Sequence, residues 1–323
     1  MNQPLIKVDH LSKHFALKKS GLFKERRYVR AVDDVSFLIG RGESFGLVGE
    51  SGCGKTTVGR SILRLTEPTA GRVEFEGRDV THFKRPQLKT YRRHAQMIFQ
   101  DPFASLNPRM TLADIVGEPL LIHRIGSKKE RRRRIITVLE TVGIDPGYMQ
   151  RFAHEFSGGQ RQRIGIARVL TLNPKLIVAD EPVSALDVSI QAQIVNLLVR
   201  LKDDFQMSYL FISHDLAVVE HIADRVAIMY LGHIVETAPS ELIYKKPRHP
   251  YTQALLTAIP RPDPDAPRQR TILEGDLPNP AQPPSGCPFR TRCPQAVDQC
   301  TAAAPAMTAV GPGHFVSCHR VDA

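Results

Sequence analysis

The sequence predicts an α/β fold followed by an irregular, cysteine-containing C-terminal extension. The first observation is a strand–loop–helix unit, in which an apolar run at residues 44–48 leads through a glycine-rich turn into helical spacing at 56–65. The second is an apolar run at 176–179 that ends in two carboxylates, as at the carboxyl edge of an open α/β sheet. The third is a change in composition after about residue 240, where proline becomes frequent.

The other predicted elements follow in order along the chain. Residues 5–48 alternate short apolar runs with polar breaks, which is typical of β-strands. Residues 101–155 contain several prolines and then a helix at about 128–142, so they predict a mostly helical insert. Strand and helix then alternate again: strands at 96–99 and 209–212, helices at 190–205 and 217–224, and two strands within 225–236.

Composition limits the classes of protein to consider. Hydrophobic residues make up 42% of the 323 residues and charged residues 24%, as in soluble globular proteins. We expect no membrane span, because no apolar run approaches the roughly 18–20 residues that one needs. The first residues also lack the pattern of a secretion signal. The net charge of +11 is compatible with a solvated basic surface, an anionic membrane face, nucleic acid or a polyphosphate.

One segment predicts a phosphate-binding loop. It fits the pattern G-x-x-x-x-G-K-[ST] and lies between a predicted strand and a predicted helix. Glycines let backbone N–H groups point at a polyphosphate, and the helix that follows presents its positive end to the same anion. We expect Lys55 to bind the β- and γ-phosphates and Thr56 to bind Mg²⁺. The loop consists of Gly49, Glu50, Ser51, Gly52, Cys53, Gly54, Lys55 and Thr56, in which Cys53 is expected to be passive.

A second segment predicts the residues that act on the metal and on water. Asp180 and Glu181 follow the apolar run at 176–179. Asp180 is expected to reach Mg²⁺ through water, and Glu181 to polarise the attacking water as a general base. Two carboxylates after an apolar run are a weak signal alone, but together with the phosphate loop they predict nucleotide hydrolysis.

The residues between these two segments resemble one family. Phe156, Ser157, Gly158, Gly159 and Gln160, followed by Arg-Gln-Arg, closely resemble the signature motif of ATP-binding-cassette (ABC) ATPases, with Phe156 where leucine is commoner. Serine and two glycines open a helix whose N–H groups can bind a γ-phosphate. In the family, that phosphate belongs to the opposite subunit.

Further positions match the same family and imply further roles. Gln100 resembles the glutamine that touches Mg²⁺ and water and senses the membrane partner. His214 resembles the histidine that contacts the γ-phosphate and steadies Glu181. Phe15 resembles the aromatic residue that stacks on adenine, and Tyr28 is its rival. Residues 184–187 resemble the loop that crosses the dimer.

The resemblance covers roughly residues 5–240 and implies a fold and a mechanism. It implies a RecA-like core with an antiparallel β subdomain and a helical subdomain at about 101–173, within an ATPase domain at 1–240. Lys55, Gln100, Glu181 and His214 would be catalytic. The residues expected to bind ATP are Phe15, Gly49, Ser51, Gly52, Cys53, Gly54, Lys55, Thr56, Thr57, Gln100, Ser157, Gly158, Gly159, Gln160, Asp180 and Asp187, and those expected at Mg²⁺ are Thr56, Gln100 and Asp180.

The C-terminal part resembles one branch of the family. The run from Lys246 to Leu256, with Pro247, Pro250 and Tyr251, and the run 275–287 resemble the extension of oligopeptide/dipeptide importer ATPases, closest to the second ATPase of the dipeptide-permease type. This implies an extension at 241–323, a different but homologous partner ATPase, two permease subunits and, indirectly, a solute-binding protein. The helical subdomain would receive the permease, and the chain would lie peripherally on the cytoplasmic face of the membrane.

Four cysteines crowd the extension, at Cys287, Cys293, Cys300 and Cys318. Clustered cysteines in a cytosolic chain indicate ligands or free thiols rather than disulfides. Four thiolates suit a cubane iron–sulfur cluster or tetrahedral zinc, and the spacing lacks the C-x2-C pairs usual for zinc. The resemblance to peptide-importer ATPases with a C-terminal cluster favours [4Fe–4S] in a structural role; zinc or nothing remains the alternative.

Other functions stay open at this point. The transported solute could be a dipeptide, a longer peptide, a nickel chelate or another small solute. A soluble ABC ATPase acting on nucleic acid is compatible with the charge, but such proteins commonly carry two cassettes or a coiled-coil insert, and neither is present. A P-loop kinase would have no use for the signature motif or for His214.

Overall fold

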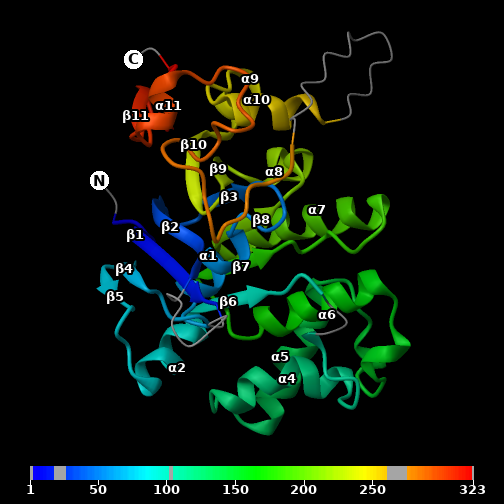
Figure 1. Ribbon diagram of the computed structural model, residues 1–323. Helices are drawn as coiled ribbons and strands as arrows, with labels where there is room; N and C mark the ends of the chain where they lie inside the picture. Colours follow the sequence, from blue (N-terminus) through cyan, green and yellow to red (C-terminus); the bar gives the residue numbers. More distant parts are fainter. Residues whose placement is uncertain (1–2, 18–26, 102–104, 260–274, 322–323) are drawn as a thin grey trace. The chain divides into compact units, whose positions relative to one another are not determined.

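The computed structural model describes residues 3–17, 27–101, 105–259 and 275–321 (Figure 1). By internal packing the chain forms two compact units, each assembled from separate stretches. Unit 1 contains residues 1–5, 39–43 and 82–212, and unit 2 contains residues 6–38, 44–81 and 213–323.

Unit 1 is built on three parallel strands. β6 (Ala95–Ile98) pairs with β7 (Leu176–Asp180), and β7 pairs with β8 (Ser208–Ser213). Every residue of β7 and β8 is buried, as expected of strands covered on both faces. The carboxyl ends of β6 and β7 therefore deliver Gln100 and Asp180 to the same edge. The predicted strands at 96–99, 176–179 and 209–212 are confirmed within a residue or two.

The helices of unit 1 include the predicted helical insert. They are α2 (Arg85–His94), α4 (Leu112–Ile122), α5 (Lys128–Thr141), α6 (Gly158–Leu170) and α7 (Val188–Phe205). Helices α4, α5 and α6 pack on one another. Ser127 and Glu130 form a capping box at the start of α5, so the basic run there is the start of a helix, as predicted.

Unit 2 holds the antiparallel β subdomain that the resemblance implies. Its four strands lie in the order β2–β1–β4–β5, and β1 pairs antiparallel with β4. The strands are β1 (Ile6–Ala16), β2 (Tyr28–Ile39), β4 (Ala70–Phe75) and β5 (Arg78–Asp79). Aliphatic side chains such as Ile6, Val8, Leu11 and Val73 are buried in its core.

Unit 2 also contains a mixed set of strands. β3 (Ser44–Val48) runs parallel to β9 (Arg225–Tyr230), and β10 (His233–Pro239) then pairs antiparallel with β9. Its helices are α1 (Lys55–Ile62), α8 (Leu216–Ile222), α9 (Ser240–Lys245), α10 (Pro250–Thr257) and α11 (Asp298–Ala302). The strand–loop–helix prediction for residues 44–65 is confirmed, with the helix ending at Ile62.

The C-terminal extension is more regular than predicted. Besides its short helices it has a hairpin of β11 (Thr308–Gly311) and β12 (His314–Val316), and β12 extends the set by pairing with β10. Buried Glu236 on β10 secures this pairing, because it accepts a hydrogen bond from His314 Nε2 at 2.7 Å. The frequent prolines led to the prediction of an irregular tail, and no pattern in the sequence indicates that β12 pairs with the distant strand β10. The proline-rich stretch at 260–274 lies outside the described residues.

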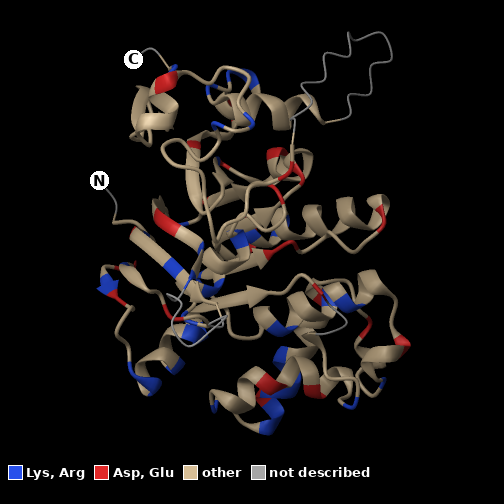
Figure 2. Ribbon diagram, in the orientation of Figure 1, with Lys and Arg blue, Asp and Glu red and all other residues tan. Residues whose placement is uncertain are grey.

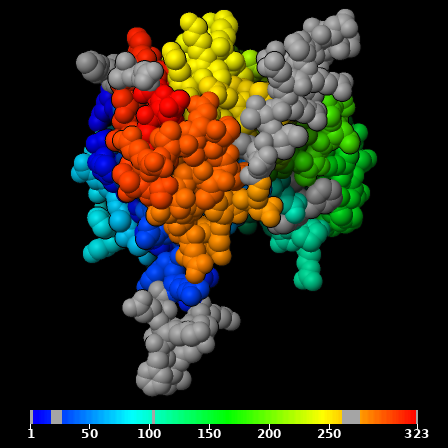
Figure 3. Space-filling view, turned by 45° about the horizontal axis from the view of Figure 1, so that its top comes forward, coloured from blue at the N-terminus to red at the C-terminus, as the bar shows by residue number. Residues whose placement is uncertain are grey.

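Basic side chains are spread over the fold. Lys and Arg occur on many elements of both units rather than on one face of a single element (Figure 2). Within the described residues, none of the helices is both long and apolar enough to cross a membrane. Residues 275–321, coloured orange to red, form a continuous part of the surface in the view of Figure 3.

Candidate functional site

The phosphate loop, residues 49–56, lies in unit 2 between β3 and α1. Gly52 and Gly54 have φ values of 83° and 112°, which L side chains rarely adopt. A Cβ on Gly54 would lie 2.0 Å from the carbonyl oxygen of Ala31, and one on Gly49 would lie 2.2 Å from that of Met229. Backbone conformation therefore requires glycine at positions 52 and 54, and close packing requires it at positions 49 and 54.

Lys55 begins α1 and turns back over the loop. Its Nζ donates to the carbonyl oxygens of Gly49 at 2.7 Å and Glu50 at 2.9 Å, and the residue is only 4% exposed. Cys53 is buried beneath it, and burial raises the pKa of its thiol. A neutral, buried thiol is a packing group, which agrees with the passive role expected of Cys53.

The carboxylate pair lies in unit 1 at the end of β7. Asp180 is 2% exposed. Glu181 has a φ of 46°, and its backbone N–H donates to the carbonyl of Ile212 at 2.9 Å. Backbone strain of this kind in a non-glycine residue is common at functional sites. Gln100 Nε2 donates to Glu181 Oε2 at 2.8 Å. The structure thus brings together Gln100 and Glu181, which are 81 positions apart in the chain. Both residues are expected to contact the attacking water.

The signature motif forms the start of α6 in unit 1. Ser157 is the N-cap residue, with its hydroxyl accepting from the N–H of Gln160, while Gln160 Oε1 accepts from the N–H of Ser157. The N–H groups of Gly158 and Gly159 have no carbonyl of their own helix to bond. Gln160 therefore shapes the helix start, and any direct contact of its side chain with phosphate stays a prediction.

The remaining predicted residues lie on exposed segments. Residues 184–185 are exposed, and Asp187 is the N-cap residue of α7. His214 is exposed in unit 2, between β8 and α8. Phe15 on β1 is 42% exposed and Tyr28 on β2 is 46% exposed, so both could offer a ring to adenine. The choice between these two rings stays open.

The four cysteines of the extension lie close enough to influence one another. Burial, together with the neighbouring Cys300, Cys293 and Cys318, raises the pKa of Cys287 to about 11. Burial and neighbouring thiols also raise the pKa of Cys293 and of Cys318. Neighbouring thiols with raised pKa values, as at Cys287, Cys293 and Cys318, are unfavourable as thiolates unless cations or a cluster neutralise them.

The sulfur atoms also receive backbone hydrogen bonds. The N–H of Arg320 donates to Cys318 Sγ at 3.4 Å, and the backbone of Phe289 and Gln295 does the same for Cys287 and Cys293. Among the described residues, no group of three or more His, Cys, Asp or Glu is arranged to hold a single metal ion.

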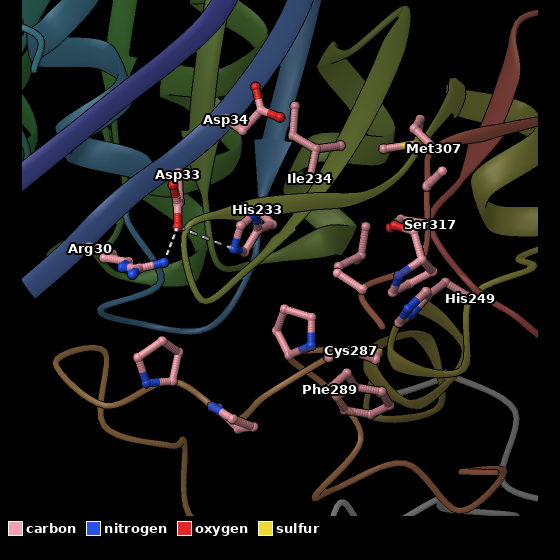
Figure 4. Close-up of a pocket in the computed structure, with 18 of the residues that line it drawn as sticks. Arg30, Asp33, Asp34, His233, Ile234, His249, Cys287, Phe289, Met307 and Ser317 are labelled. Carbon is pink, nitrogen blue, oxygen red and sulfur yellow. Dashed lines mark hydrogen bonds and ion pairs between the residues drawn. The ribbon is translucent and has the colours of Figure 1, made fainter. Parts of the chain in front are cut away.

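A cavity of about 870 Å³ opens beside this region of unit 2 (Figure 4). Cys287, His249 and Phe289 line it on the extension side, and the facing side carries Arg30 and Asp33, whose ion pair measures 3.3 Å. No residue of the phosphate loop lines this cavity. It is therefore separate from the phosphate-binding loop.

Two residues that contact the phosphate loop were missed by the sequence analysis. Arg292 and Tyr251 of the extension both bind Glu50, the second residue of the loop. The run around Tyr251 resembles the extension of importer ATPases, but nothing in it indicates a contact with the phosphate loop. No local signal marks Arg292, because its partner lies 242 positions away in the chain.

Comparisons with known proteins agree with these observations. The family description "ABC transporter" matches residues 32–184, and "Oligopeptide/dipeptide transporter, C-terminal region" matches residues 235–300. A protein of Brucella ovis, whose name describes a peptide import ATP-binding protein, is 58% identical over 317 residues, which cover 98% of each chain. The oligopeptide transport ATP-binding protein AppF of Bacillus subtilis is 51% identical, over 98% of this chain and 97% of AppF.

Solved structures give the same fold. The ATP-binding cassette MJ0796, a dimer bound to ADP and phosphate in a post-hydrolysis state, superposes with a TM-score of 0.64 at 29% identity. The match covers 73% of this chain and 98% of that chain, so it leaves part of the present chain without a counterpart.

Proposed function

The chain belongs to the family of ABC transporter ATP-binding proteins, and we propose that it hydrolyses ATP to power the import of di- and oligopeptides through a membrane transporter. The observation that carries this proposal is the pair of matches at 32–184 and 235–300 in one chain, with the phosphate loop and Glu181 in the first. Relatives similar over almost the whole length carry peptide import or oligopeptide transport in their names, which favours peptides over a nickel chelate or nucleic acid.

The proposed roles follow from the chemistry of each residue. The N–H groups of the phosphate loop and the charge of Lys55 bind the phosphates. Thr56 supplies an oxygen ligand for Mg²⁺ and Asp180 reaches the ion through water. Glu181 takes a proton from the attacking water, and the amide of Gln100 orients its carboxylate. His214, Asp187 and either Phe15 or Tyr28 complete the proposed site on the resemblance alone.

Completion of the site requires a second subunit. Ser157 and Gly159 of each chain would bind the γ-phosphate held by the partner, so ATP joins the two subunits and hydrolysis separates them. We propose that the partner is a homologous ATPase of different sequence. Two permease subunits would bind the helical subdomain at about 101–173, and the chain would work at the cytoplasmic face of the membrane. The division between ATPase domain and extension near residue 240 belongs to the same proposal.

The four cysteines of the extension are proposed to hold a [4Fe–4S] cluster. Their mutual proximity, the raised pKa values of Cys287, Cys293 and Cys318 and the N–H groups directed at these three sulfurs suit a cluster, which binds thiolates around several irons rather than one ion. When bound, such a group would cross-link the part of the extension between Cys287 and Cys318. Iron and acid-labile sulfide in anaerobically purified protein would support this assignment, whereas stoichiometric zinc without iron would refute it.

The proposed function is tested by purifying the tagged chain from native membranes. We expect two polytopic membrane proteins and a second ATPase to copurify, and peptide with its binding protein to stimulate ATP turnover. Recovery of the chain with nucleic acid and without membrane proteins would refute the proposal. Stimulation by a nickel chelate but not by any peptide would retain the transporter and overturn the proposed cargo.

A further inference from the structure

We propose that Arg292 and Tyr251 of the C-terminal extension are positioning residues for the phosphate loop, holding Glu50 so that the loop keeps its nucleotide-binding shape. This inference rests on the proposed ATPase function and adds residues outside every motif of the cassette. All the contacts that carry it lie within unit 2.

Glu50 is held at three points. Its carboxylate accepts two hydrogen bonds from the Arg292 guanidinium, at 2.7 and 3.1 Å, in a bidentate arrangement. Its backbone N–H donates to the Tyr251 hydroxyl at 3.0 Å. Its carbonyl oxygen accepts from Lys55 Nζ at 2.9 Å. Glu50 therefore links two residues of the extension to the lysine that is proposed to bind the phosphates.

The Arg292–Glu50 pair is sheltered from water. The side chain of Arg292 is 8% exposed and that of Glu50 is 28% exposed. Hydrogen bonds to Glu50 raise the pKa of Arg292, so the guanidinium stays charged. Exposed ion pairs contribute little because solvent screens them, but a bidentate pair at this depth is screened less. Loss of Arg292 would leave the negative charge of the part-buried Glu50 carboxylate without this partner, within the loop that is proposed to bind an anion.

The two positioning residues are themselves held by a cluster of buried rings. Tyr230, Tyr251 and Phe289 are at most 1% exposed, and their ring centroids lie 4.8 to 5.4 Å apart. The Arg292 guanidinium lies 5.9 Å from the centre of the Tyr230 ring. Buried aromatic packing of this kind restricts both side chains to one arrangement. Arg292 and Tyr251 can therefore impose a position on Glu50.

The segment that supplies Arg292 runs between two of the cysteines. Backbone hydrogen bonds from Arg290 to Cys287 and from Arg292 to Phe289 fold it into successive turns. Arg292 directly precedes Cys293. The extension thus reaches the phosphate loop through a short, turned segment with a cysteine at each end.

The test compares Arg292→Ala with Arg290→Ala in the full-length chain. Arg290 is the matched control, because it lies two positions away and bonds to Ser285 rather than to the loop. Affinity for a non-hydrolysable Mg–ATP analogue is measured together with KM and kcat for ATP. We expect Arg292→Ala to raise Kd and KM roughly tenfold, which corresponds to about 1.4 kcal/mol, and Arg290→Ala to change them less than twofold. Arg292→Lys should restore part of the loss, because lysine keeps the charge but not the bidentate geometry.

A double-mutant cycle separates positioning from general destabilisation. Because Arg292 acts through Glu50, adding Glu50→Gln to Arg292→Ala should cause little further loss of affinity. Tyr251→Phe, which keeps the ring, should raise KM by a smaller factor at an unchanged melting temperature. Independent, additive losses from Arg292→Ala and Glu50→Gln, or an unchanged KM in Arg292→Ala, would overturn the proposal. Lys55→Ala run in parallel tests the proposed function itself: if it leaves nucleotide binding intact, the ATPase assignment fails, whatever Arg292 does.

Discussion

The phosphate loop and the cysteine site occupy the same unit of the protein but are encoded in different ways. The loop uses eight consecutive residues, and each of its glycines answers a backbone requirement that can be stated position by position. The cysteine site draws its four thiols from a stretch of 32 residues that includes a helix and a hairpin between them. A contiguous motif specifies its own geometry, whereas a dispersed one depends on the fold to bring its members together.

The same contrast applies to the residues that join the two sites. Glu50 belongs to the motif, but its meaning depends on Arg292 and Tyr251, which come from far along the chain. Substitutions in the contiguous motifs are therefore expected to have larger effects than substitutions in the dispersed site.

The largest effect is expected at the carboxylate of the cassette. Glu181→Gln removes the proposed general base while keeping the size of the side chain, so ATP turnover should fall by roughly 10²–10⁴-fold with nucleotide binding retained. Glu220→Gln, on the exposed surface of α8, is the control and should hydrolyse ATP normally. ATP turnover near the wild-type rate in Glu181→Gln would show that another group activates water.

The next effect tests the glycine geometry of the loop. In Gly54→Ala the new methyl group would meet the Ala31 carbonyl at 2.0 Å, and the backbone would stay at a φ of 112°. We expect the loss of measurable ATP binding together with a lower melting temperature. Gly165→Ala is the matched control, because nothing lies within 4 Å of the added Cβ in this helical position. It should bind ATP normally, and alanine is favoured over glycine there by about 1 kcal/mol. Retained ATP binding in Gly54→Ala would contradict the close packing of the loop.

Local patterns in the sequence specify the main elements of the fold and of the site, but not the contacts between distant residues. The parallel strands, the phosphate loop, the carboxylates and the start of α6 follow from local patterns, and the structure has them within a residue or two. The pairing of β12 with β10, and of Arg292 with Glu50, could not be predicted, because nothing near Arg292 or His314 in the sequence identifies a partner. The extension after residue 240 is more regular than predicted for the same reason: proline frequency describes local backbone, but strand pairing is decided by distant residues.

A smaller effect is expected from the dispersed site. Replacing Cys300 by serine should remove bound iron and lower the melting temperature by a few degrees, on the order of 1–2 kcal/mol. It should raise the Kd for ATP only slightly, since Arg292 remains. Cys53→Ala, outside the extension, should keep its full iron content. Iron content that survives Cys300→Ser would exclude the four-cysteine site.

The last effect appears only below neutral pH. Burial lowers the pKa of His249 from 6.5 to about 4, so the folded protein keeps this ring neutral while the unfolded chain protonates it below pH 6.5. Stability contributed by the neutral ring is complete above pH 6.5 and is lost as pH falls towards 4, by at most about 3 kcal/mol. His249→Asn keeps a side-chain acceptor for the N–H of Tyr251 but cannot titrate. The free energy of unfolding, measured with urea at several pH values from 7 to 4, should therefore fall less steeply with decreasing pH in His249→Asn than in the wild type. The same pH dependence in both proteins would assign it to other groups.

The most direct test of the account is the rate of ATP turnover in the complex from native membranes when Ser157 is changed to aspartate or to asparagine. Both residues keep the cap of α6, but aspartate places a negative charge where the partner's γ-phosphate is proposed to bind. We predict that Ser157→Asp lowers turnover by at least roughly 100-fold, about 2.7 kcal/mol, while Ser157→Asn stays within tenfold of the wild type. Full turnover in Ser157→Asp would contradict the shared nucleotide and the transport mechanism that depends on it.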